Sequence, residues 1–173
     1  METLSWRSVG FVPGLTGSHL GLPADAICWT PSQADARVAD FRLNHTTLET
    51  GLNGPIGYAT RLVPGFGAEL KAALRESFGS ALAVGAVGRV VPDARSGIDL
   101  DPLQRDVLGL PVARISSVLT KQSVTRLRQM AKAARAVLAE AGAVLVEEAG
   151  SRDSFTATHV FGTARMGSDR TTS

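Results

Sequence analysis

The sequence has very little cysteine and no long apolar run. Its single cysteine, Cys28, excludes an internal disulfide and a multi-cysteine zinc site, so this residue is expected to be a small buried side chain. No apolar stretch approaches the roughly 20 residues that a membrane-spanning helix needs. Residues 1–21 also lack a basic start followed by an apolar stretch, so no export signal is recognised and a cytoplasmic location is the default expectation.

An excess of one charge is also absent. Eighteen Lys and Arg residues face sixteen Asp and Glu residues, which leaves a formal charge of +2 and no field that would attract a polyanion. Nucleic acid is therefore not an expected partner. The one feature that favours it is a basic row at Arg128, Lys132 and Arg135, which is more typical of a solvated helix face.

Several motifs of common enzyme sites are missing as well. The three histidines, His19, His45 and His159, show no metal-ligand spacing, so no metal site is predicted. The sequence contains no G-x-S-x-G elbow, which removes support for nucleophilic hydrolysis. It also contains no G-x-G-x-x-G and no phosphate loop ending in G-K-[ST], so a dinucleotide-binding half is not encoded in these residues.

What is present fits one globular domain, since 173 residues are close to the usual domain size. Residues 1–65 contain many prolines and glycines, which predict short strands and irregular connections in a loop-rich N-terminal part. Apolar residues then recur at helical spacing over 66–78, and Gly79 is placed to end that helix.

The middle of the chain predicts strands. Residues 80–91 are rich in Val and Ala, a turn cluster follows, and 98–100 alternate apolar and polar residues, which together predict a β-hairpin. β-Branched residues over 112–119 favour a third strand. Successive strands of this kind indicate an antiparallel sheet.

The clearest predicted element is a helix over 121–141. Its apolar residues form one stripe, with Thr120 placed to cap the start and Gly142 the end. The stripe comprises Val124, Leu127, Ala131, Ala134, Leu138 and Ala141. Residues 143–148 predict a short strand after it, so the expected fold class is α+β, a mainly antiparallel sheet backed by the two amphipathic helices.

The last segment, 155–173, has neither helical nor strand periodicity but gathers polar residues and glycines, as functional loops do. Residues 159–169 read His-x-x-Gly-Thr-x-Arg-Met-Gly-x-Asp. This order resembles the motif near the C-terminus of the glucose-methanol-choline (GMC) oxidoreductases. The resemblance extends less sharply upstream to about Phe66, where the order of strands and helix is similar to the substrate-binding domain of that family; residues 1–65 are assigned to the same domain by position.

The resemblance implies an FAD-dependent oxidation of an alcohol. In the family the histidine of this motif lies beside the flavin and takes the hydroxyl proton of the alcohol, a role that falls on His159. Gly162 and Gly167 are expected to let the backbone approach the ring system. Thr163, Arg165 and Asp169 are expected to brace the loop, and Met166 to pack.

Three features depart from the family pattern. Arg170 follows Asp169 where the family usually has proline. The chain stops at Ser173, before the second active-site residue of the family, a His or Asn. The flavin-binding Rossmann fold is also missing, so we expect a fragment that needs a separate flavin domain and has little activity alone. The alternative is a non-catalytic interaction domain that keeps the scaffold without the cofactor half.

Overall fold

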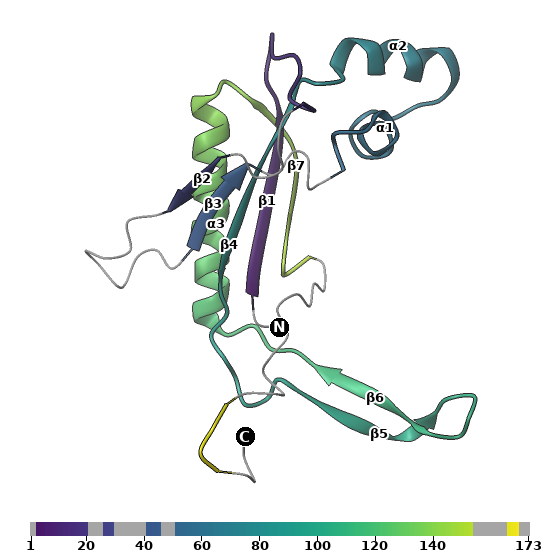
Figure 1. Ribbon diagram of the computed structural model, residues 1–173, viewed down its shortest axis with the longest axis vertical. Helices are drawn as coiled ribbons and strands as arrows, with labels where there is room; N and C mark the ends of the chain where they lie inside the picture. Colours follow the sequence, from purple (N-terminus) through teal and green to yellow (C-terminus); the bar gives the residue numbers. More distant parts are fainter. Residues whose placement is uncertain (1–2, 21–25, 30–40, 46–50, 154–165, 170–173) are drawn as a thin grey trace.

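The computed structural model describes residues 3–20, 26–29, 41–45, 51–153 and 166–169, which form a sheet, a long helix and two smaller units. Figure 1 shows their arrangement. The strands are β1 (Thr3–Phe11), β2 (Ile27–Trp29), β3 (Phe41–His45), β4 (Ala81–Arg89), β5 (Gly97–Arg105), β6 (Pro111–Ser116) and β7 (Val144–Gly150). The helices are α1 (Pro55–Leu62), α2 (Gly67–Ser77) and α3 (Lys121–Glu140).

Five strands make the main sheet in the order β2-β3-β4-β1-β7, and every neighbouring pair is antiparallel. Residues directly opposite each other in such pairs share a face, so the register assigns each side chain to one side. Leu4 and Ala86 belong to one core cluster, and Val9 and Ala83 to another on the opposite face. Small and β-branched residues in β4 therefore suit a strand that is buried on both sides.

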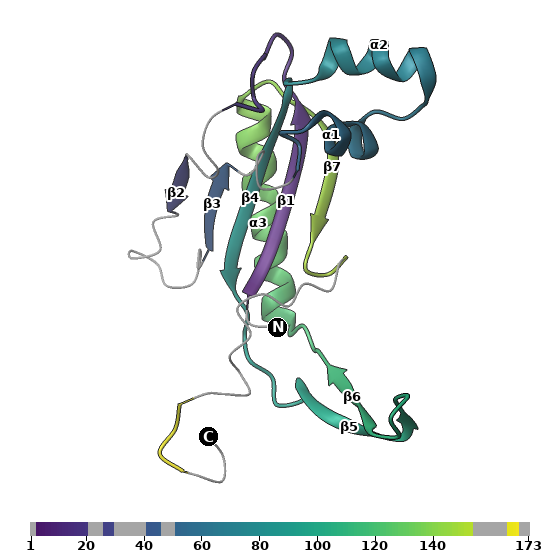
Figure 2. The same ribbon diagram turned by 45° about the vertical axis from the view of Figure 1, so that its right-hand side comes forward.

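The long helix α3 covers one face of the sheet, as the two views in Figures 1 and 2 show. Its buried positions fall on one stripe, with Leu127, Met130 and Leu138 all at most 4% exposed. The Thr120 side chain caps the helix by accepting a hydrogen bond from the Ser123 amide at 3.1 Å. Gly142 follows the end with a φ of 69°, a left-handed conformation that glycine adopts without strain.

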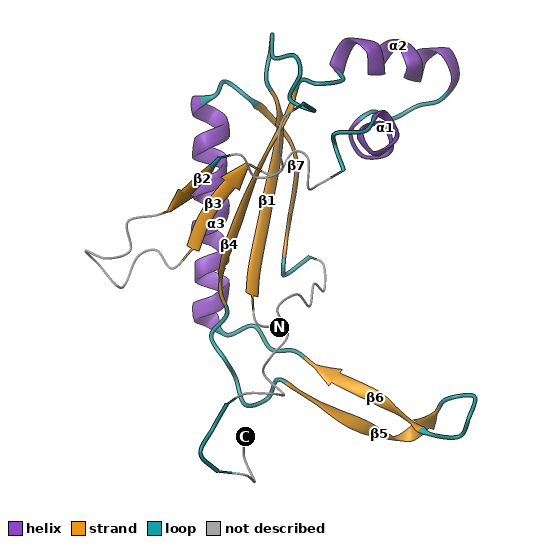
Figure 3. Ribbon diagram, viewed as in Figure 1, coloured by secondary structure: helices purple, strands orange, loops and turns teal. Residues whose placement is uncertain are grey.

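The two short helices α1 and α2 cover only one end of the opposite face. Tyr58 of α1 is fully buried there with Val9 and Ala81, and its hydroxyl donates to the Ser77 carbonyl at the end of α2. Among the described residues, no helix covers the rest of this face (Figure 3). That part of the sheet, called the open face below, lies on the side of β3, β4 and β1 away from α3.

The strands β5 and β6 form a separate two-stranded hairpin that projects away from the main sheet (Figure 1). One side carries the Asp99–Arg114 ion pair. The other side carries Ile98, Leu100 and Ile115, which are 58%, 63% and 58% exposed. Both sides of the hairpin are therefore exposed, including the apolar one.

The α+β class and the mainly antiparallel sheet are confirmed, and so are both amphipathic helices. The hairpin predicted from 80–100 is wrong, because β4 pairs with β1 and β3 while β5 pairs with β6. The turn between β4 and β5 is a local signal, and the contacts of β4 with β1, a strand about 80 residues earlier, override it.

Two expectations about the N-terminal part are also corrected. This part contains a regular nine-residue strand, β1, that lies between β4 and β7 in the sheet. Cys28 is exposed rather than buried, because β2 is the edge strand of the sheet. In the portion that the structure describes, none of the helices combines the length and apolar character of a membrane span.

Candidate functional site

Most of the predicted site residues lie outside the part of the chain that is described. His159, Gly162, Thr163 and Arg165 all belong to this undescribed segment. Gly167 and Asp169 are described, and both are exposed. Met166 is fully exposed, so the expectation that it packs is wrong, and residues 167–169 beside it are exposed as well.

The turn that precedes the predicted motif is tied to the start of β1. The Ser151 amide donates to the Ser5 carbonyl at 2.9 Å, and the Ser5 amide donates to Ser151 Oγ at 2.8 Å. The Gly150 amide donates to Asp153 Oδ2 at 2.9 Å, which closes the turn. The chain therefore leaves the sheet toward His159 from a hydrogen-bonded point, which the sequence did not reveal because Ser5 and Ser151 are 146 residues apart.

Gly150 also brings the backbone of β7 close to an aromatic ring. A Cβ atom at this position would lie 2.4 Å from Cε3 of Trp6 and 3.2 Å from the Ser5 carbonyl oxygen. Only a residue without a side chain fits such a contact. The turn before the motif thus rests directly on Trp6.

A polar row crosses the open face from β3 to β1. Asn44 lies opposite Gly85, and Gly85 lies opposite Arg7, so the two polar side chains flank a position that has none. Asn44 Oδ1 and Arg7 Nε are both buried, and neither finds a hydrogen-bond partner in the described structure. Buried polar atoms are normally paired, so two orphans on one row indicate a place that a polar molecule or segment completes.

Glu147 holds the Arg7 side chain in place. Its Oε1 atom accepts from Arg7 and from Arg61 of α1, each at 2.6 Å. Burial alone would raise the pKa of Glu147, but the hydrogen bonds from Arg61 and Arg7 outweigh burial and lower it. The carboxylate is therefore ionised at neutral pH and links β7, β1 and α1.

Glu148 makes a corresponding link on the face that α3 covers. It accepts two hydrogen bonds at 2.9 Å from Arg135 Nε, and Ser8 Oγ donates to it at 2.7 Å. Burial opposes ionisation here too, but the bonds from Arg135 and Ser8 lower the pKa of Glu148. The neighbouring carboxylates of Glu147 and Glu148 thus bind partners on opposite faces of β7.

The described residues contain no group of three or more His, Cys, Asp or Glu side chains that would hold a metal ion. The buried polar atoms of the open face that lack a partner in the described structure are one amide oxygen and one guanidinium nitrogen. Such groups bind and orient a polar molecule by hydrogen bonds.

These features define an α+β domain with one helix-covered face, one partly open polar face, and a glycine-rich motif after the last strand. The family model described as GMC oxidoreductase matches residues 92–173, so this part of the chain is similar to the C-terminal domain of that family. The match takes in β5, β6, α3, β7 and the motif at 159–169. A comparison with curated proteins found no match to the chain.

Proposed function

We propose that the chain is the C-terminal part of an FAD-dependent oxidoreductase that oxidises the CH–OH group of an alcohol, with His159 as general base. The observation that carries this proposal is the motif at 159–169 inside the family match. An imidazole with a pKa of about 6.5 accepts a proton at neutral pH and releases it afterwards.

In this proposal the residues of the motif support one proton transfer, from the alcohol hydroxyl to His159. An imidazole nitrogen of His159 takes the hydroxyl proton of the alcohol, which gives the oxygen alkoxide character and makes loss of hydride from the carbon easier. FAD, when bound, would supply the acceptor for that hydride. Gly162 and Gly167 allow close approach of the backbone to the ring, while Thr163, Arg165 and Asp169 brace the loop.

The open face supplies polar atoms that fit an alcohol. Gly85 is buried and adds no side chain, so no Cβ atom lies between the polar groups of Arg7 and Asn44. The orphaned Arg7 Nε is a donor, and the orphaned Asn44 Oδ1 is an acceptor. A hydroxyl group both donates and accepts, so these two atoms suit the binding and orientation of an alcohol.

Residues 1–65 are proposed to be the N-terminal part of the same domain as 66–173. The position of β1 between β4 and β7 supports this, because the sheet would be divided without it. The phosphate-binding half for FAD is proposed to come from a flavin domain outside these residues. We therefore expect the isolated chain to bind little FAD, and a yellow protein with one flavin per chain would contradict this.

Complementation tests the function. The chain is co-expressed with a flavin-binding domain of the same family, and alcohol-dependent reduction of an electron acceptor is measured. Replacement of the proposed base by His159→Ala should abolish activity, whereas the same change at His45 of β3 should not. Equal activity of the His159→Ala complex would contradict the proposal.

A second candidate, a non-catalytic interaction domain, is favoured by the β5–β6 hairpin. Its side with Ile98, Leu100 and Ile115 is exposed, and a lone two-stranded hairpin is marginally stable in water. This role predicts that a complex with a flavin domain forms but oxidises no alcohol. The double change Ile98→Ser and Ile115→Ser should then prevent the complex from forming.

A further inference from the structure

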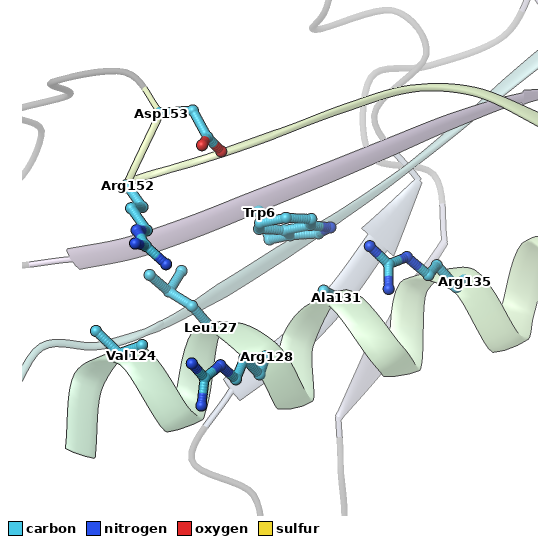
Figure 4. Close-up of a pocket in the computed structure, with 8 residues that line it drawn as sticks. All are labelled: Trp6, Val124, Leu127, Arg128, Ala131, Arg135, Arg152 and Asp153. Carbon is cyan, nitrogen blue, oxygen red and sulfur yellow. The ribbon is translucent and has the colours of Figure 1, made fainter. Parts of the chain in front are cut away.

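A cavity of about 250 Å³ lies between α3, β1 and the turn after β7. Figure 4 shows Trp6 between the helix residues on one side and the turn residues on the other. The lining residues are Trp6, Val124, Leu127, Arg128, Ala131, Arg135, Arg152 and Asp153. The helix residues recur at spacings of three and four, so they share one side of α3.

The floor of the cavity is apolar and aromatic. Leu127 is 4% exposed and Ala131 is 5% exposed, and both lie beside the Trp6 ring. The indole nitrogen of Trp6 donates to Ser8 Oγ at 3.0 Å, so its polar edge is already satisfied. What Trp6 offers the cavity is therefore ring surface, which favours a flat apolar group.

The rim of the cavity is positively charged. Arg135 is neutralised by Glu148, whose carboxylate accepts three hydrogen bonds from its guanidinium group. Arg128 and Arg152 form no ion pair with any residue that the structure describes. The only acidic lining residue is Asp153, and one of its oxygens is already bonded to the Gly150 amide.

We propose that this cavity binds a small aromatic monocarboxylate. The two unpaired guanidinium groups suit a carboxylate, with which arginine forms planar, paired hydrogen bonds. The Trp6 ring and the aliphatic floor suit an aromatic body. The volume of about 250 Å³ lies just below the usual range for ligand pockets, about 300–1,000 Å³, so one ring with a short substituent fits whereas a dinucleotide does not.

Benzoate is the test ligand, and benzamide is its uncharged control of nearly the same shape. Each is titrated into the 173-residue chain while the indole ¹H–¹⁵N resonances are followed by NMR, with Trp29→Phe identifying the signal of Trp6. Benzoate should shift the Trp6 signal to saturation and bind at least tenfold more tightly than benzamide. Absence of saturable binding, or equal affinity for the two ligands, overturns the proposal.

The arginines are tested by charge removal. The double variant Arg128→Gln/Arg152→Gln should weaken benzoate binding at least tenfold, and thermal unfolding checks that the fold is kept. The double variant Lys121→Gln/Lys132→Gln is the matched control, because both residues are exposed cations of α3 that do not line the cavity. An equal loss in both variants would assign the effect to general charge and overturn the proposal.

Discussion

The contact between Gly150 and Trp6 gives a sharp prediction for the substitution Gly150→Ala. The added Cβ atom would lie 2.4 Å from Trp6 Cε3 and 2.8 Å from Cζ3. Carbon atoms in contact normally lie about 3.5 Å apart, so the ring must move by roughly 1 Å. Movement of β7 is not an easy alternative, because the same Cβ atom would lie 3.2 Å from the Ser5 carbonyl oxygen, which belongs to the backbone of β1.

Overpacking of this kind typically costs about 1–3 kcal/mol, and we expect Gly150→Ala to lower the free energy of unfolding by that amount. Urea unfolding followed by far-UV circular dichroism measures it, and near-UV circular dichroism should report the displaced Trp6 ring. Gly97→Ala is the matched control, because no atom outside its chain neighbours lies within 4 Å of a Cβ there. That variant should unfold within about 0.5 kcal/mol of the original chain.

A double-mutant cycle separates the Trp6 contact from other effects of the added methyl group. The cost of Gly150→Ala should fall when Trp6→Phe provides a smaller ring, and the coupling between the two sites should be about 1 kcal/mol or more. If Gly150→Ala is as stable as Gly97→Ala and leaves the near-UV spectrum unchanged, the packing of β7 on Trp6 is refuted.

Three further predictions concern the links between elements. Glu147→Gln should lower the free energy of unfolding by about 1–2 kcal/mol, because it weakens the partly buried bonds to two arginines, whereas Asp99→Asn in the exposed hairpin should have no measurable effect; similar losses would contradict this. The pKa values of Glu147 and Glu148 are lowered from 4.5, so their stabilisation is complete above that pH and is lost as the pH falls through the lower folded-state values. The original chain should therefore lose more stability between neutral pH and acidic pH than a chain in which both residues are Gln, because Gln does not titrate; parallel pH profiles would oppose this. Met130→Ala should lower the free energy of unfolding in urea by about 2–5 kcal/mol, because the Met130 side chain is fully buried between α3 and the sheet. A loss as small as that of Val107→Ser in the exposed hairpin would contradict the assigned core.

Local sequence signals predicted the elements whose information lies within a few residues. The helix α3 was predicted over 121–141 and is found over Lys121–Glu140, because its apolar stripe, Thr120 cap and Gly142 end are all local. The strand β1 was missed because its partners β4 and β7 lie about 80 and 140 residues away along the chain. The false hairpin at 80–100 has the same cause, since β4 satisfies its hydrogen bonds with distant strands.

The candidate site also has one part that the local sequence predicts and one part that it does not. The motif at 159–169 is continuous in sequence and was recognised without a structure. The link from Glu147 to Arg7 and Arg61, the orphaned Asn44 oxygen and the cavity beside Trp6 are assembled from separate segments, so no local pattern predicts them. The position of His159 remains a prediction, because it lies outside the described residues.

The role of His159 is tested most directly by following the first half of the reaction, the reduction of the flavin by the alcohol, in a single turnover. The complex with a flavin domain is mixed with an alcohol without oxygen, and loss of the yellow absorbance is timed across a range of pH. The rate in the original chain should rise with pH as the imidazole of the base loses its proton. His159→Gln should reduce the flavin about 100- to 10,000-fold more slowly and without that rise. Flavin reduction by the variant at the original rate, with an unchanged pH profile, would contradict the assignment of His159 as the base.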